Sequence, residues 1–274
     1  MIYKDIEIPY RQGWKKFNWY LSGDWHVMSI FCIEDLIEKH MKIIGKDPHS
    51  KWVHMGDIAD LVIPSDNRYD PSGLLRPSWL DPDDFAECTR KRIEDLIKPA
   101  KHNCEGILSG NHSYTFRKHV FDNFQKHVCA DSGVDNLGYS CGLRLFFRRE
   151  NSTECHVLKM WLTHGNGGGR TLGAKVKRLE DWMKEREGDI YGFAHVHDYA
   201  SIEKPMQTLE GSFGQPKVKE HTGVGALTAC YLKAYMEGEV PSYGEVKVYS
   251  PTVLGCVKFE IDLSDFSVLP SRIR

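Results

Sequence analysis

Residues 51–60 of this chain read KWVHMGDIAD, a largely apolar run that ends in a glycine and two aspartates. The run predicts a buried β-strand over residues 51–55, with Asp57 and Asp60 in the loop that follows it. A strand holds the backbone in place at its end, while the loop beyond it leaves room for water and substrate. This arrangement is typical of a metal ligand carried at the edge of a sheet.

Four other segments also place His, Asp or Asn at the end of a hydrophobic run. They are Asp24-Trp25-His26, Gly110-Asn111-His112, Thr163-His164-Gly165 and His195-Val196-His197. Any one of them is weak evidence, because such short patterns occur by chance and most polar residues are simply solvated. Five such segments in a chain with only 13 histidines together indicate a site for two metal ions. An enzyme is therefore the leading interpretation.

The candidate ligands offer carboxylate, carboxamide and imidazole groups. This borderline-hard set suits manganese, iron, zinc or nickel. No cysteine occupies a ligand position in the five segments, which argues against a structural zinc site. We therefore expect two divalent metal ions, with manganese as the first choice and iron, zinc or nickel as alternatives.

Strands alternate with helices along the chain. Residues 18–22 and 51–55 are predicted as strands, with a helix between them over residues 31–44. This βαβ unit indicates a sheet of parallel character. The other predicted elements are a helix over 81–97 that Pro99 ends, strands at 106–109, 143–147 and 156–163, a helix over 172–182 and a strand at 190–193. The chain is predicted to have an α/β (α+β) fold.

The five segments, in this order, resemble the motifs of the calcineurin-like metallophosphoesterases, and the resemblance runs from Asp24 to His197. Four stretches are similar to a phage- and prokaryote-associated branch of that superfamily: LSGNH at 108–112, LGYS at 137–140, HGNGGGR at 164–170 and DIYGFAHVH at 189–197. The resemblance implies a single metallophosphoesterase domain over residues 1–274. It also implies a double β-sandwich flanked by helices, with a dinuclear metal site at one sheet edge.

The resemblance assigns roles to nine residues. One ion would be held by Asp24, His26 and His197, the other by Asn111, His164 and His195, and Asp57 would bridge the two. Two such ions lower the pKa of a bridging water and stabilise the charge on the phosphoryl oxygens. His112 would be the general acid and Asp60 the carboxylate that keeps it oriented and protonated. The alternative is that Asp60 only ends a loop and His112 is an ordinary surface histidine.

Two positions depart from the family pattern. Ala194 precedes His195 where the family commonly has glycine, which predicts a slightly altered backbone at that turn. Ser113 follows His112 where the family commonly has an acidic residue, which predicts weaker support of the metal ligands. Neither departure removes a candidate ligand.

The glycine-rich loop over residues 165–170 is the best local indication of the substrate. Its glycines allow backbone amides to approach an anion closely, and Arg170 is a candidate clamp for a phosphate. Lys175, Lys177 and Arg178 follow in the next predicted helix. The alternative is that the glycines only form a tight turn and the basic residues form a solvated helix face.

Two stretches lie outside the motifs. Residues 63–79 are rich in turn-forming residues and are predicted as a loop excursion beside the metals, either a lid or a plain surface loop. Residues 204–274 are predicted to complete the second sheet, with strands at 227–234 and 253–261 after a loop.

Composition is that of an ordinary globular protein, with 41% hydrophobic and 27% charged residues in 274. The net charge of -2 gives no overall basic surface for nucleic acid. The chain has no signal-like start and no long apolar segment, and its eight cysteines are scattered, so we expect a cytoplasmic protein without a membrane partner. Its oligomeric state does not follow from the sequence.

The expected activity is metal-dependent hydrolysis of a phosphoester. A phosphodiester of nucleotide or nucleic-acid-end type is the first choice of substrate, and a phosphomonoester or phosphoprotein is the alternative. The Asp-Arg-Gly signature typical of protein phosphatases is missing after the second segment, since Asp60 leads into Leu61-Val62-Ile63. A different class is also open, namely a metal-stabilised binding protein whose catalysis is vestigial.

Overall fold

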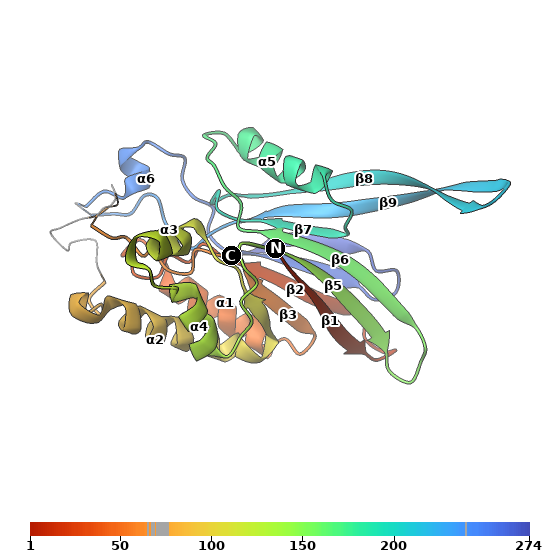
Figure 1. Cartoon of the computed structure of the whole chain (residues 1–274), viewed down its shortest axis with the longest axis horizontal. Helices are drawn as coiled ribbons and strands as arrows, with labels where there is room; N and C mark the ends of the chain where they lie inside the picture. The colour runs from red at the N-terminus through yellow and green to blue at the C-terminus, as the bar shows by residue number, and fades with distance from the viewer. Residues whose placement is uncertain (65, 67–68, 70–76, 239) are drawn as a thin grey trace.

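Two β-sheets packed face to face form the centre of the protein (Figure 1). The computed structural model describes all residues except 65, 67–68, 70–76 and 239. The six-stranded sheet has the order β1-β5-β6-β7-β9-β8, with bounds Ile2–Tyr10, Ser140–Arg149, Cys155–Thr163, Ile190–Phe193, Gln215–Thr228 and Tyr199–Ser212. The five-stranded sheet has the order β11-β10-β2-β3-β4, with bounds Val268–Ile273, Cys256–Asp262, Lys16–Ser22, Ser50–His54 and Cys104–Ile107.

The inner faces of the two sheets share one hydrophobic core. Trp19 and Leu21 of β2 belong to the same packed cluster as Leu145 and Phe147 of β5, and all four are fully buried. Side chains alternate between the faces of a strand, so each sheet presents one apolar face to the other. The architecture is therefore a mixed α/β sandwich with helices on its outer faces.

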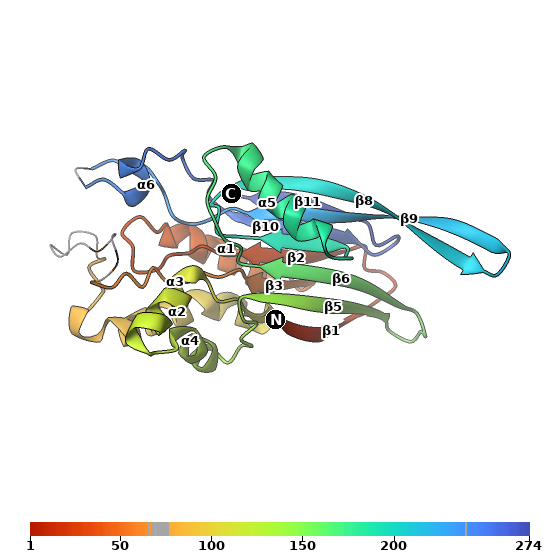
Figure 2. The same cartoon turned by 45° about the horizontal axis from the view of Figure 1, so that its top comes forward.

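Helices cover the outer faces of both sheets (Figures 1 and 2). On the five-stranded sheet, Trp52 of β3 packs in one cluster with residues of α1 (Glu34–Lys46), α2 (Phe85–Ile97) and α4 (Phe124–Ser132). On the other sheet, α5 (Leu172–Lys184) packs Leu179 and Met183 against Tyr191 of β7. Short elements complete the set: η1 Pro82–Asp84, η2 Lys98–Asn103, α3 Asn111–Val120 and α6 Tyr243–Val246. Among the helices of the described chain, none combines the length and the apolar character that a membrane span requires.

Up to residue 193, the predicted elements are found within a few residues of their expected places, but β1, α3 and α4 were not predicted. Strand β1 pairs in parallel with β5 and buries only alternate residues, Ile6, Ile8 and Tyr10. Helix α2 ends at Ile97 as expected, but a 3-10 helix continues through Pro99, because proline is tolerated in the first turn of a helix.

The prediction that residues 204–274 complete the second sheet is wrong. Strands β8 and β9 join the six-stranded sheet, whereas β10 and β11 join the five-stranded sheet beside β2. The strand predicted over 227–234 ends at Thr228, because Ala229 adopts a positive φ of 61° and the chain leaves the sheet. The loop predicted before it is in fact most of an antiparallel hairpin, β8–β9.

The outer part of this hairpin extends past the rest of the sandwich (Figures 1 and 2). We call residues 205–222 the hairpin arm. Its cross-strand pair Leu209 and Val218 is 76% and 61% exposed, and Phe213 at the turn is fully exposed. A ribbon that buries neither face has no alternating hydrophobic pattern, so the usual sequence signal of a strand is missing here.

Candidate functional site

The five predicted ligand segments converge at one end of the sandwich. Strands β2, β3 and β4 are parallel neighbours in one sheet, and β6 and β7 are parallel neighbours in the other. Parallel neighbours bring their carboxyl ends to the same edge, which is where α/β proteins place their sites. The two edges meet because the backbone N–H of His195 donates to Asp24 Oδ2 at 2.9 Å.

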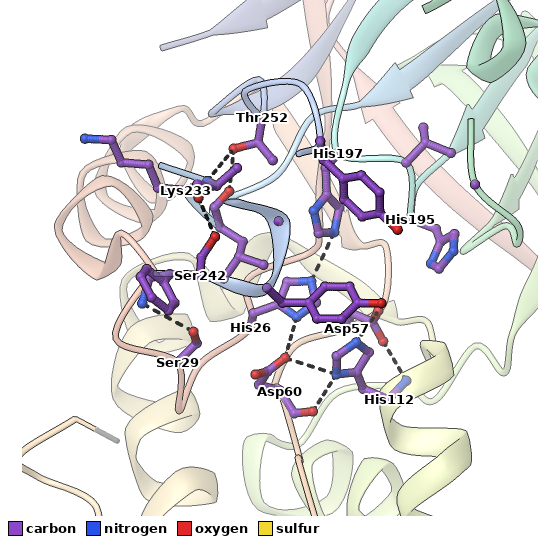
Figure 3. Close-up of a pocket in the computed structure, with 18 of the residues that line it drawn as sticks. His26, Ser29, Asp57, Asp60, His112, His195, His197, Lys233, Ser242 and Thr252 are labelled. Atoms are coloured by element: carbon purple, nitrogen blue, oxygen red, sulfur yellow. Dashed lines mark hydrogen bonds and ion pairs between the residues drawn. The ribbon is translucent and has the colours of Figure 1, made fainter. Parts of the chain in front are cut away.

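The nine residues with predicted roles lie together here. Figure 3 shows His26, Asp57, Asp60, His112, His195 and His197 among them. Three groups have ligand atoms within 4.8 Å of one another: Asp24, His26 and His197; Asp57, His164 and His195; and His26, Asp60 and His112. Asn111 completes the set, with its Oδ1 3.0 Å from Nε2 of His164. The first two groups are the ones that the resemblance assigns to the two ions.

The backbone at these positions is strained. Asp24, His26, Asp57, His195 and His197 all have positive φ values, between 48° and 70°. Residues with a Cβ rarely adopt this left-handed conformation, and each instance costs of order 1–3 kcal/mol. The surrounding fold therefore holds five candidate ligands in a conformation that they would not adopt in a free loop.

Two glycines permit the close packing of the site. A Cβ on Gly110, just before α3, would lie 1.9 Å from Asp57 Oδ1, although the backbone there is extended at φ -106°. A Cβ on Gly56 would lie 2.5 Å from Nδ1 of His164, and Gly56 also has a positive φ of 100°. The glycines of these two motifs are thus required by the volume of the neighbouring ligands.

Asp57 lies at the centre of the site and is 1% exposed. Its Oδ1 accepts a hydrogen bond from the backbone N–H of His112 at 3.0 Å, and its Oδ2 lies 3.1 Å from Nε2 of His164. Burial would raise the pKa of Asp57, but the positive potential of His112 and His164 outweighs it and holds the pKa well below its usual range. The carboxylate of Asp57 is therefore anionic and lies beside both His112 and His164.

His164 is oriented by the backbone of the other sheet. Its Nδ1 lies 2.9 Å from the carbonyl oxygen of Met55, so Nδ1 carries a proton and Nε2 faces Asp57 and Asn111. Burial would lower the pKa of His164, but Asp57 and Asp24 raise it to about 9. His195 has no such partner, and burial lowers its pKa to about 4. Two imidazoles in one group thus differ in charge according to their neighbours.

The ligand atoms of Asp24, His26 and His197 also lie close to one another. Nε2 of His26 and Nε2 of His197 are 3.1 Å apart, and Nδ1 of His26 is engaged by Asp60 Oδ1 at 3.1 Å. Asp24 is fully buried, yet no described residue donates a well-formed hydrogen bond to its Oδ1, and Nε2 of His197 lies 3.5 Å away. A buried carboxylate oxygen without a donor is costly unless a cation lies beside it.

Asp60 contacts both His26 and His112 (Figure 3). Its Oδ1 lies 3.1 Å from Nδ1 of each imidazole, and its backbone carbonyl also accepts from Nδ1 of His112. Burial would raise the pKa of Asp60, but the hydrogen bonds from His112 and His26 outweigh it and lower the pKa. Because Nδ1 of His112 is held in this way, its Nε2 points towards Asp57, 3.7 Å from Oδ2.

The two departures from the family pattern have different structural outcomes. Ala194 lies in the core between the sheets, 1% exposed and without a positive φ, so the position has no need of glycine. Ser113 is buried on α3, and its hydroxyl has no hydrogen-bond partner. The serine thus supplies none of the support that an acidic residue would give to the ligands beside it.

A cavity of about 890 Å³ opens over the ligands. The glycine-rich loop contributes residues 167–169, and Arg170 and Lys175 also line it. Lys175 is paired with Asp198 at 3.2 Å, whereas Lys177 pairs with Glu180 and Asp181 on the exposed face of α5. Of the basic residues singled out in the sequence, only Arg170 and Lys175 line the cavity.

Part of the predicted excursion at 63–79 borders the same cavity through Tyr69. Residues 65, 67–68 and 70–76 of that excursion lie outside the described residues. Tyr69 therefore borders the cavity, as expected for this stretch. Its position does not decide between a lid and a surface loop.

A third side of the cavity was missed in the sequence. We call residues 232–238 and 240–252 the cavity wall; it lies between β9 and β10 and includes α6. Its two ends are tied to the ligand loops, because Tyr231 N–H donates to the carbonyl of Asp24 at 2.9 Å and Val253 N–H to that of His197 at 3.1 Å. No local pattern marks these residues, since contacts to distant segments bring them here: the two backbone bonds and the buried ring of Tyr231, which packs against Trp25.

No family model and no curated protein matches the chain. Among solved structures, a conserved uncharacterized protein and predicted phosphoesterase from Streptococcus pneumoniae is 16% identical, with a TM-score of 0.34 over 95% of this chain and 99% of that one. GAP50, described as the anchor in the inner membrane complex of Plasmodium, is 10% identical, with a TM-score of 0.46 over 95% and 89%. A double mutant of Vps29 from Entamoeba histolytica is 11% identical, with a TM-score of 0.34 over 94% and 98%. At these TM-scores, the likenesses add no argument to the geometry of the site.

Proposed function

We propose that this protein is a metallophosphoesterase of the calcineurin-like type, which hydrolyses a phosphodiester with two divalent metal ions. The observation that supports this most directly is a pair of groups of candidate ligands. One is formed by Asp24, His26 and His197, and the other by Asp57, His164 and His195, with Asn111 beside His164; Asp57 is the proposed bridge between the two ions. A carboxylate shared by two sets of nitrogen and oxygen ligands is the arrangement that a two-metal site requires.

The residues present fit two such ions. Among the described residues, no hydrogen-bond donor reaches the Asp24 Oδ1 atom. Nδ1 of His164 donates to the carbonyl of Met55, so Nε2 is the nitrogen that would bind an ion, with release of its proton. Imidazole, carboxylate and carboxamide donors suit manganese, iron, zinc or nickel. When bound, two such ions activate water and stabilise charge on the phosphoryl oxygens.

His112 acts as the general acid for the leaving group. Its Nδ1 is held by Asp60, which leaves Nε2 as the position from which a proton is given to the departing oxygen. The Asp60 carboxylate favours the protonated imidazole and fixes its orientation. Arg170 lines the cavity on the other side, where it binds the phosphoryl group or a neighbouring phosphate.

The shape of the cavity favours a diester over a monoester. At about 890 Å³ the cavity is in the size range of sites for whole organic ligands and is much larger than a phosphate group. A diester needs room for a group on each side of the phosphorus, and the cavity wall and the glycine-rich loop provide two such sides. A small phosphomonoester or a phosphorylated side chain would leave most of this volume empty.

A binding protein with vestigial catalysis is the second candidate. Its support is Ser113, where the hydroxyl has no partner and the ligands lack an acidic neighbour. Against it stands the pair of His112 and Asp60, because a purely structural metal site has no use for an oriented proton donor.

Hydrolysis of bis(4-nitrophenyl) phosphate and of 4-nitrophenyl phosphate tests the proposal. The protein is stripped of metal, reloaded with manganese, nickel, zinc or iron, and compared with the Asp57→Asn variant. We expect metal-dependent turnover that prefers the diester and falls by at least ~100-fold in the variant. Stoichiometric binding of two ions without turnover of either substrate would favour the binding protein, and a preference for the monoester would overturn the diester assignment.

A further inference from the structure

The cavity continues well beyond the candidate metal ligands, along the cavity wall. Tyr243 and Tyr249 of the wall line this part and remain 40% and 44% exposed. Their rings meet edge to face, with centroids 6.2 Å apart. Two half-exposed aromatic rings beside each other in a concave site are a surface on which another ring can stack.

The wall is held in place by its own polar groups. The hydroxyl of Ser242 donates to the carbonyl of Ala234, and that of Thr252 donates to the carbonyl of Leu232 at 2.6 Å. Tyr235 donates its hydroxyl to the carbonyl of Tyr249 at 2.7 Å. These side chains are therefore engaged in fixing the backbone, and the wall is organised before a ligand arrives.

What the wall offers to a ligand is mainly ring and apolar surface. Met28, Phe31 and Leu232 line the cavity together with the two tyrosines. The carboxylates among its described lining residues, Asp57 and Asp60, both belong to the metal end. Lys233 is a charged residue of the wall that also lines the cavity, and it can donate to an acceptor at the edge of a ligand. This end of the cavity therefore suits a flat group with apolar faces and acceptors at its edge, while the phosphate of the same ligand lies at the metals and Arg170.

We infer that the cavity wall is a nucleobase subsite, in which one of the rings of Tyr243 and Tyr249 stacks on the base of a nucleoside phosphodiester and the other meets its edge. This inference rests on the proposed diesterase function and adds the identity of one ester group. A nucleobase has two apolar faces and no net charge, and base stacking on aromatic side chains does not depend on which base is present. The tyrosines are specificity-determining residues and do not touch the reacting atoms.

Two diesters with the same leaving group separate the subsite from the chemistry. Thymidine 5′-(4-nitrophenyl phosphate) and methyl 4-nitrophenyl phosphate release the same phenol and differ only in the retained group. We expect kcat/KM to be about 5- to 100-fold higher for the thymidine ester, from the usual strength of base stacking. The Tyr243→Ala/Tyr249→Ala variant loses this preference, and the Tyr243→Phe/Tyr249→Phe variant keeps it.

Tyr3→Ala provides a matched control, because Tyr3 is 71% exposed on β1 and does not line this cavity. It should leave the preference unchanged. A preference below about twofold in the native protein, or one that persists in the double alanine variant, overturns the inference. If the alanine variant does not fold, as judged by its thermal melt, two measurements still test the inference. They are the ratio of kcat/KM for the thymidine ester to that for the methyl ester in the native protein, and the same ratio in the phenylalanine variant.

Calorimetry gives a readout that does not need turnover. Binding of thymidine 5′-monophosphate is compared with binding of 2-deoxyribose 5-phosphate in the metal-loaded protein. Tighter binding of the nucleotide that is lost in the double alanine variant supports the base subsite even if neither diester is hydrolysed, and in that case only the proposed function fails. Equal affinity for the two phosphates overturns the subsite, even where diester hydrolysis is observed.

Discussion

The two ends of the sandwich are built from the same sheets but differ in what they gather. At one end, the loops after β2, β3, β4, β6 and β7 bring eight histidines and aspartates into three neighbouring groups, with Asn111 beside them. At the other end, the hairpin arm extends beyond the body of the protein with both faces exposed (Figure 1). Neighbouring parallel strands have their carboxyl ends on the same side, so the loops that follow them converge. An antiparallel hairpin has only one short turn at its tip.

The backbone shows the same difference. In the hairpin arm, positive φ values fall on Gly211 and Gly214, where they are not strained. At the ligand end they fall on histidines and aspartates, where they cost free energy. Among the candidate ligands the strain is concentrated on five residues, whereas the hairpin arm has positive φ only at glycines. Strain retained in this way is typical of a functional site.

Removing the proposed proton donor should have the largest effect on activity. His112→Asn keeps a polar group near Asp60 but provides no ionisable proton. We expect kcat for the diester to fall by ~10²- to 10⁴-fold, because that is the usual contribution of general acid catalysis. Metal content, measured by mass spectrometry, should remain at two ions, and a loss of one ion would instead place His112 among the ligands.

Filling the space beside Asp57 should cause the next largest loss of diesterase activity. Gly110→Ala places a methyl group where Asp57 Oδ1 lies, and a displacement of about 1 Å at a reacting centre can cost ~100-fold in rate. The matched control is Gly173→Ala on α5, where a Cβ meets nothing within 4 Å. The control should keep full activity and gain about 0.5–1 kcal/mol of stability. Equal activity of the two variants would contradict the close packing at Gly110.

His54 should make the ligand end sensitive to acid. It is fully buried, and burial lowers its pKa to about 3 from an ordinary value of 6.5. The unfolded chain therefore binds more protons between these values, so stability that is present above pH 6.5 is lost as the pH falls towards 3. From this group we expect a loss of about 1–2 kcal/mol between pH 7 and pH 5.

The His54→Asn variant tests this by urea unfolding at pH 7 and pH 5. Asparagine keeps an acceptor for the N–H of Gly56, which donates to Nδ1 of His54 at 3.1 Å, but does not titrate. The variant should be less stable at pH 7 and show a weaker dependence on pH. An unchanged pH dependence would mean that His54 is not the group that titrates.

Changes in the hairpin arm should have the smallest effect. Leu209→Thr and Val218→Thr alter an exposed cross-strand pair that packs on nothing in the described chain. The free energy of unfolding should change by less than ~0.5 kcal/mol, as is usual for surface positions, and diester hydrolysis should be unaffected. A marked change in hydrolysis would show that the two ends are coupled and would remove the contrast between them.

The sequence by itself determined which residues gather at the ligand end. Each of the five segments follows a hydrophobic run, so local pattern alone predicted a strand, its end and the polar residue beyond it. The same local reasoning predicted the helices α1, α2 and α5, whose apolar positions follow the helical period. It missed α3 and α4, and it missed β8–β9, whose outer half buries neither face.

Only the tertiary structure decided what surrounds those residues. The cavity wall reaches the site because Tyr231 donates to the carbonyl of Asp24, a backbone contact that no side-chain pattern encodes. The division of the C-terminal strands between the two sheets likewise depends on which edge was left free by strands formed elsewhere. The candidate ligands are thus recognisable from local sequence, whereas the shape of the cavity depends on contacts between distant segments.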